Sequence, residues 1–194
     1  METQAVGTHA ATRAWRPDIE FMPARELCLL QECLLAQVVH RARQTPFFRD
    51  RLRQLPADLF VMPLARFQAE VPLTGKADLR QAQAAAWVTD RDTQIALLLA
   101  TSGTTGTRIM LPYTREDVAR WYDLSARTLW TNGLRPEDVV LLPVPLGLFT
   151  GGHGMFGGLQ RLGCTTVPIG VVHTAQFAEL LRGGMGITPT AIVT

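Results

Sequence analysis

Residues 139–169 read VVLLPVPLGLFTGGHGMFGGLQRLGCTTVPI, and their order decides the fold class. The apolar run at 139–144 is typical of a buried strand, and residues 164–169 predict another strand. Residues 152–162, between them, predict a helix that tolerates several glycines. Strands and helices in alternation are typical of an α/β fold, so this stretch predicts a largely parallel sheet with flanking helices.

The same alternation extends over the second half of the chain. The six-residue apolar run at 95–100 is short enough for a buried strand. Thr114, with Asp117 three residues later, has the form of a helix-capping box, and Gly133 marks the end of that helix. The other elements predicted here are strands at 107–113 and 190–194 and a helix at 174–181.

The first half of the chain has a different character. Only two of the protein's 16 glycines precede residue 100, and apolar residues there recur near helical spacing. Three helices are expected in this half, at 23–44, 47–55 and 74–85. Thr74 is the predicted N-terminal cap of the third. The sequence therefore predicts a mainly helical region at 1–93, followed by an α/β subdomain at 94–194.

Composition and charge disfavour several classes of protein. The chain of 194 residues is 47% hydrophobic and 19% charged, and its formal net charge of +2 disfavours nucleic-acid binding. The longest apolar run, at 139–149, is interrupted by Pro143 and Pro145 and is shorter than the roughly 18 residues of a membrane-spanning helix. Residues 1–12 lack the basic and apolar segments of a secretory signal, so the cytoplasm is the expected location.

The cysteines and histidines predict neither a disulfide framework nor a metal site. The four histidines lie far apart in the sequence, without Glu or Cys at ligand spacing. His153, in a glycine-rich loop after a strand, is the one placed where a substrate could be met. Three cysteines have no disulfide or CxxC pattern and are expected to be reduced and partly buried: Cys28, Cys33 and Cys164.

A polar segment between two predicted strands is the sharpest local signal: Thr101-Ser102-Gly103-Thr104-Thr105-Gly106. Its glycines permit tight turns, and its hydroxyls and free amides can surround phosphate oxygens without carrying charge. The residues alone leave a second interpretation open, a turn whose Ser and Thr side chains cap their own backbone. The segment is not a Walker A loop, because that motif ends in GK[ST] and opens a helix.

Residues 152–157 satisfy a second pattern, GxGxxG, which also occurs in dinucleotide-binding folds. Such a fold would place an acidic residue about 20 positions later, at the end of the next strand. That strand ends in Pro168, Ile169 and Gly170 instead. We therefore interpret these glycines as positions of close packing between a helix and a sheet.

Six segments carry a family resemblance. They are 15–20 (WRPDIE), 46–49 (PFFR), 71–80 (VPLTGKADLR), 101–106 (TSGTTG), 113–117 (YTRED) and 147–152 (GLFTGG). Through them the sequence resembles the phenylacetate-CoA ligases, members of the adenylate-forming superfamily of acyl-CoA synthetases. The resemblance runs from Trp15 to the last residue.

The resemblance implies an acid–thiol ligase that activates a small carboxylic (aryl) acid with ATP, forms an acyl-adenylate, and passes the acyl group to CoA. ATP, Mg²⁺ and CoA are the implied cofactors, and no catalytic residue is assigned. Oriented donors and Mg²⁺ would stabilise the charge that moves onto pyrophosphate. The implied phosphate-binding residues are Thr101, Ser102, Gly103, Thr104, Thr105, Gly106 and Arg108. The residues near the implied acyl pocket are Phe149, Gly151, Gly152 and His153.

The sequence departs from the family pattern in two respects. Thr107 and Arg108 stand where the family usually has Lys-Pro, so Arg108 could supply the cation one place later. At residue 194 the family sequence is only about half complete, without the adenine-contacting segment and the catalytic lysine. Lys76, the only lysine, matches a different family position. We therefore expect a natural truncation or a fragment that is inactive alone and binds phosphate weakly.

Other functions and partners stay open. The alternatives are a non-catalytic module that binds phosphate or a partner, and a coenzyme F390 synthetase-like adenylyltransferase. In the complete family fold, later chain would cover the strand at 190–194 and the sheet expected to contain 95–100 and 139–144. Uncovered apolar faces and sheet edges tend to find partners. We therefore expect self-association or pairing with a separately encoded half, unless the helix at 23–44 covers the sheet.

Overall fold

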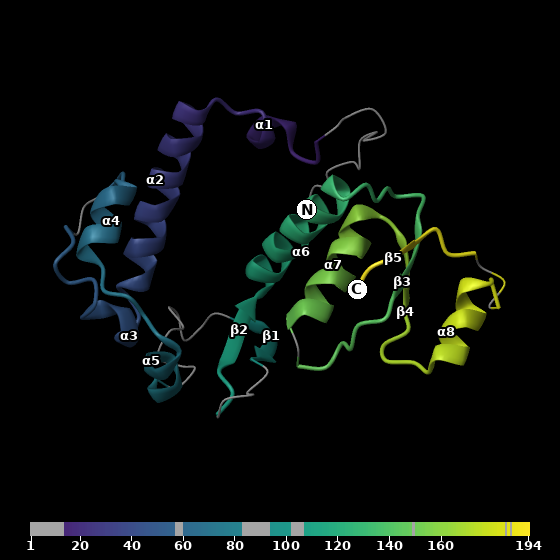
Figure 1. The fold of residues 1–194 in the computed structure, drawn as a ribbon. Coiled ribbons are helices and arrows are strands. Elements are labelled where there is room, and N and C mark those ends of the chain that lie inside the picture. Colours follow the sequence, from purple (N-terminus) through teal and green to yellow (C-terminus); the bar gives the residue numbers. More distant parts are fainter. Residues whose placement is uncertain are drawn as a thin grey trace. The chain divides into compact units, whose positions relative to one another are not determined.

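The computed structural model describes residues 14–56, 60–82, 94–101, 107–148, 150–184, 186 and 188–194 of the chain. They form two compact units, whose helices and strands are labelled in Figure 1. One unit is 21–115, and the other combines residues 14–20 with residues 116–194. The domain division near residue 93 remains a prediction from the sequence.

Helix α2, Ala24–Ala42, is the long helix predicted at 23–44. Two of the three shorter helices that follow it pack on α2 through Phe48 and Phe67, which are partly buried against a common core. The buried members of that core are Ala36, Val39, Leu52, Leu55 and Met62. The shorter helices are α3 (Pro46–Arg49), α4 (Leu64–Glu70) and α5 (Lys76–Gln81).

Side chains determine where two of the short helices begin. Thr45 is 1% exposed, and its hydroxyl oxygen accepts a hydrogen bond from the Phe48 amide at 3.2 Å. The same hydroxyl donates to a carbonyl at the end of α2 at 2.7 Å, which joins α2 to α3. Helix α5 begins after Gly75 and not at Thr74 as predicted, because the Asp78 carboxylate accepts from the Gly75 amide at 2.7 Å.

Two features of this helical part differ from the prediction. The helix predicted at 47–55 consists only of the four residues of α3, followed by turns. Helix α4 was not predicted, because it has seven residues, follows Pro63 and has no side-chain cap. Helices this short are marginal in isolation, so α4 depends on the packing of Phe67 and Val71 against the core.

The strand predicted at 95–100 is present, but it does not belong to the parallel sheet. β1 (Ile95–Ala100) pairs antiparallel with β2 (Met110–Thr114) in a separate two-stranded sheet. A parallel pairing needs a crossover of about a dozen residues or more, and the connection here is only 101–109. The strand is also not buried throughout, because Leu98 is 47% exposed while Leu99 is buried.

The parallel sheet lies in the other unit and confirms the predicted fold class, a mixed α/β protein. Its strands follow the order β4-β3-β5, and both pairings are parallel. The strands are β3 (Val139–Leu142), β4 (Thr165–Pro168) and β5 (Ala191–Ile192). The helices that alternate with them are α6 (Arg115–Thr131), α7 (Thr150–Leu162) and α8 (Thr174–Leu181) (Figure 1).

The core of this unit joins α6 and α7 to the central strand. Trp130 of α6, Val140 of β3 and Leu159 of α7 are buried in one apolar cluster. Trp15, just before the short helix α1 (Pro17–Glu20), belongs to the same cluster, with its ring centroid 5.9 Å from that of Trp130. None of the helices described is long and apolar enough to cross a membrane.

Candidate functional site

The loop that joins β1 to β2 is closed at its base by two hydrogen bonds between Thr101 and Ile109. The Thr101 amide donates to the Ile109 carbonyl at 3.0 Å. The Ile109 amide donates to the Thr101 hydroxyl oxygen at 3.1 Å. Ile109 is buried and Thr101 half-buried, so the two ends of the loop are held together.

Two of the predicted phosphate-binding residues can be placed on this loop. Thr101 forms its base, and Arg108 is exposed next to Ile109. Among the residues that the structure describes, no acidic side chain forms an ion pair with Arg108. The rest of the predicted segment, 102–106, lies outside the described residues.

The predicted acyl-pocket residues follow the carboxyl end of β3 and enter the first turn of α7. His153 Nε2 lies 2.9 Å from the Gly147 carbonyl oxygen. A carbonyl only accepts, so Nε2 carries the proton and donates it. Gly152 is buried, and a Cβ there would lie 2.2 Å from the Pro145 carbonyl oxygen. The loop thus contacts the first turn of α7 at Gly147 and at Pro145. Phe149, the remaining predicted residue of this loop, lies outside the described residues.

The two predicted groups belong to different compact units. Thr101 and Arg108 lie in the unit 21–115, whereas Gly151, Gly152 and His153 lie in the unit that contains 116–194. Within the second unit, the structure brings His153 to Gly147 and Gly152 to Pro145.

The glycines of α7 form a flat surface against α6. A Cβ at Gly154 would lie 2.8 Å from the Trp121 ring, and one at Gly157 would lie 2.2 Å from the Tyr122 ring. At Gly158 a Cβ would come within 2.6 Å of the Ser125 side chain. The contacts of Gly154 and Gly157 confirm close packing for these two glycines of the GxGxxG segment. The surface they pack on is helix α6, however, and not the sheet.

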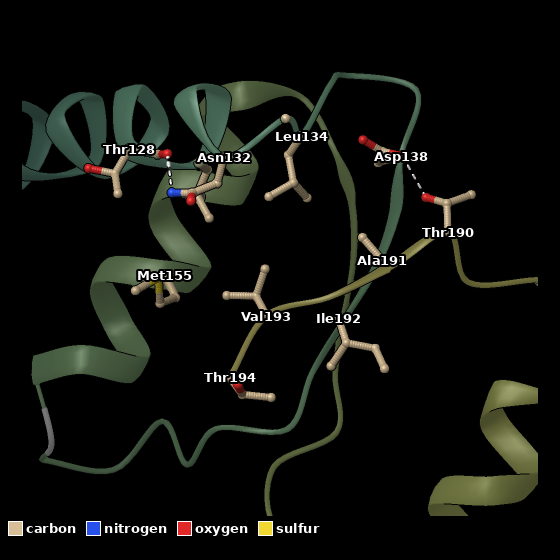
Figure 2. A pocket seen from close by; sticks show the side chains of 12 residues that line it. Thr128, Asn132, Leu134, Asp138, Met155, Thr190, Ala191, Ile192, Val193 and Thr194 are labelled. Carbon is tan, nitrogen blue, oxygen red and sulfur yellow. Dashed lines mark hydrogen bonds between the residues drawn. The ribbon is translucent and has the colours of Figure 1, made fainter.

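A hollow of about 530 Å³ was not predicted from the sequence. Figure 2 shows it between the end of α6, Met155 of α7 and residues 190–194. Its polar edge holds Asp138, whose carboxylate accepts from the Thr190 hydroxyl at 2.7 Å and from the Arg135 amide at 2.7 Å. The residues come from separate elements, so no local pattern could have indicated the hollow. It contains none of the predicted site residues.

Cysteines and acidic residues form no metal site in the described ranges, where no three His, Cys, Asp or Glu side chains converge. Cys164 is buried, and its thiol donates to the Arg135 carbonyl at 3.1 Å. Burial, followed by the negative charges of Asp138 and Glu137, raises the pKa of the Cys164 thiol from 9.0 to about 11.

We expect Cys164 to resist thiol reagents near pH 7, because the reactive thiolate forms only toward pH 11. Cys28 is exposed and should react fast in the folded chain. Peptide mass spectrometry after timed alkylation, with and without urea, checks this difference. The raised pKa favours the neutral thiol in the folded state, so its contribution to stability is full below pH 9 and is lost as the pH rises to about 11. Equal alkylation rates at Cys28 and Cys164 in the folded chain would contradict the burial of Cys164.

The sequence of the chain is similar to those of known enzymes. No family model matches the chain. It is 32% identical over 169 residues to the phenylacetate-coenzyme A ligase of Thermus thermophilus, covering 87% of this chain and 38% of the relative. It is 33% identical over 143 residues to the phenylacetate-coenzyme A ligase of Pseudomonas putida, covering 74% of this chain and 33% of the relative. The chain thus spans between a third and two fifths of the length of these relatives.

Solved structures with a similar fold are acyl-CoA ligases. A crystal structure of 2-hydroxyisobutyryl-CoA ligase with 2-HIB-AMP and CoA, in the thioesterification state, matches with a TM-score of 0.82 at 30% identity. The match covers 94% of this chain and 40% of that one. An open conformation of that ligase, with the same two ligands, matches with a TM-score of 0.82 at 29% identity, over 94% and 44%. Over the part of these proteins that it spans, the chain belongs to the phenylacetate-CoA ligase family.

Proposed function

We propose that the chain forms part of an ATP-dependent carboxylic acid–CoA ligase, to which it contributes the phosphate loop and one wall of the acyl pocket. The supporting observation is its identity of 32–33% to phenylacetate-CoA ligases, together with a fold like that of an acyl-CoA ligase solved with an acyl-AMP and CoA. The complete enzyme would form an acyl-adenylate and then an acyl-CoA thioester. Its substrates would be a small aryl acid, ATP and CoA.

The loop of the β1–β2 hairpin would hold the phosphates of ATP. Residues 102–106 bring three hydroxyls and two glycines to this loop, and the pairing of Thr101 with Ile109 joins its ends. Neutral donors of this kind fit phosphate oxygens, and the exposed Arg108 would add one positive charge. Mg²⁺ bound with ATP would neutralise further charge on the phosphates.

The loop after β3 would form one wall of the acyl pocket. Ligands of open α/β sheets bind beyond the carboxyl ends of parallel strands, which is where this loop lies. His153 donates to the Gly147 carbonyl and Gly152 packs on the Pro145 carbonyl, which attaches residues 145–147 to the first turn of α7. A fixed wall favours selection among acids by size.

Titration calorimetry of the 194-residue chain tests the phosphate-binding part of the proposal. We expect pyrophosphate and ATP to bind with similar, weak affinity, because the proposed contacts are to the phosphates. Replacing Thr104 and Thr105 with Ala should weaken both, whereas Thr131→Ala, on the exposed side of α6, should weaken neither. Tight ATP binding with which adenosine competes would contradict the proposal.

Exchange of labelled pyrophosphate into ATP, with a panel of aryl acids, separates an enzyme from a non-catalytic binding module. We expect binding without exchange from these 194 residues alone, because they span at most two fifths of the length of the relatives above. Acid-dependent exchange would make the chain an enzyme in its own right. Failure to bind either pyrophosphate or ATP would overturn the proposal. Self-association, or pairing with a separate half, remains a prediction.

A further inference from the structure

We infer that α2 binds a second copy of this chain, and that the two α2 helices pack antiparallel through the side that faces away from the core. The inference is independent of the proposed phosphate site. It rests on a second row of apolar side chains along α2 and on the charges at the two ends of that row. This row, the outer stripe, consists of Leu27, Leu30, Leu34 and Val38.

Apolar residues lie on two sides of α2. The core side consists of Leu35, Ala36, Val39 and Ala42. Figure 1 shows two of the helices that share this core, α3 and α4, beside α2. Leu34 and Val39 are five residues apart, which separates them by about 140° around the helix. Leu34 is 48% exposed and Val38 is 50% exposed, whereas Val39 is buried. Helices with apolar residues all round are typically covered on every side, so the outer stripe indicates a second packing partner.

The spacing of the outer stripe suits a helix that packs along it. Its residues recur every three or four positions, so they form one ridge about 16 Å long. In an antiparallel pair, Leu27 of each copy would lie opposite Val38 of the other, and Leu30 would lie opposite Leu34. Every residue of the stripe then meets an apolar residue, so a second copy of the chain is a matching surface.

The charges at the ends of the stripe determine the direction of the pair. Glu26 is in the first turn of α2 and Arg41 in the last, and both are exposed. In the described part of the chain, neither forms an ion pair. An antiparallel pair brings Arg41 of each copy close to Glu26 of the other, and the two helix dipoles also oppose each other. A parallel pair would place Arg41 beside Arg41, which costs free energy.

Sedimentation equilibrium of the 194-residue chain, over a concentration series, measures the association. The stripe contributes only four side chains per copy, so we expect a weak dimer with a Kd of about 10–100 µM. Leu34→Lys should weaken it at least about tenfold, because the pair would bury two unpaired charges. Leu29→Lys is the matched control and should stay within about twofold. Leu29 is on the same helix and 51% exposed, but it lies about 140° from Leu34.

A charge exchange tests the antiparallel arrangement. Glu26→Arg and Arg41→Glu should each weaken the dimer by about tenfold, because two-fold symmetry makes each ion pair occur twice. The double variant E26R/R41E should recover the original Kd within about twofold, since it restores opposite charges. Circular dichroism checks that every variant is folded.

Three results would overturn the inference. The first is a chain that stays monomeric up to about 0.5 mM, well above the expected Kd. The second is a dimer that Leu34→Lys leaves unchanged, which would place the contact on another surface such as the uncovered sheet. The third is a double variant E26R/R41E that associates no better than the single variants.

Discussion

The Gly157→Ala variant is expected to lose about 2–3 kcal/mol of its free energy of unfolding, the cost of overpacking a tight contact. A Cβ at this position would lie 2.2 Å from the Tyr122 ring, so α7 would have to move away from α6. Gly154 and Gly158 hold the helices at the same short distance, which limits relaxation. In a helix without such a contact, Gly→Ala would stabilise by up to about 1 kcal/mol, so the sign of the change identifies the contact.

Unfolding in urea, monitored by circular dichroism, measures this loss of unfolding free energy. Gly147→Ala is the matched control, because nothing lies within 4 Å of its Cβ position, and it should change stability little. The double variant Gly157→Ala/Tyr122→Ala should lose less than the two single losses added, since removing the ring relieves the clash. A Gly157→Ala chain more stable than the original would mean that α6 and α7 lie farther apart than the 2.2 Å approach at Gly157 implies.

The Trp130→Ala variant is expected to lose about 3–5 kcal/mol, as buried tryptophans commonly do when truncated. Trp130 is 2% exposed, and the Trp15 ring packs against it with centroids 5.9 Å apart. The Arg135 guanidinium lies 3.9 Å from the centroid of the Trp130 ring, a cation–π contact. Removing the indole therefore leaves a cavity and also weakens the attachment of the N-terminal segment to α6.

The same unfolding measurement, with Leu124→Ala as control, checks this loss. Leu124 is on the same helix but is 60% exposed, so its truncation should stay within about 0.5 kcal/mol of the original chain. Trp130→Phe should fall between the two, because a smaller ring fills part of the cavity. Equal losses in Trp130→Ala and Leu124→Ala would contradict a central position of Trp130 in the core.

The elements of residues 116–194 could be predicted because their ends are marked in the sequence. Gly133 and Gly163, with φ of +97° and +96°, stand just beyond the ends of α6 and α7. Glycine is favoured there, since other residues adopt this conformation only at a cost. Helix α8 has the predicted bounds, 174–181. The other bounds were less accurate: α7 begins at Thr150 and not at 152, β3 ends at Leu142 and not at 144, and β5 has only two of the five residues predicted at 190–194.

The partners of the elements could not be predicted in the same way. The apolar run at 95–100 indicated a strand, but its antiparallel partner depends on the short connection that follows it. The small residues at 152–157 indicated close packing, but side-chain size alone does not say whether a sheet or a helix lies opposite. The hollow in Figure 2 depends on segments far apart in the sequence, among them Met155 and residues 190–194.

The β1–β2 hairpin has a consequence for how a phosphate group would be held. Many phosphate sites lie at the start of a helix, where free amides and the helix dipole supply about half a positive charge. The loop at 101–109 joins two strands, whose dipoles largely cancel. Under the proposed function, compensating charge must then come from Arg108 or from ions that arrive with the nucleotide. The hairpin would give the phosphate site its shape and leave most of the charge to the ligand's own metal.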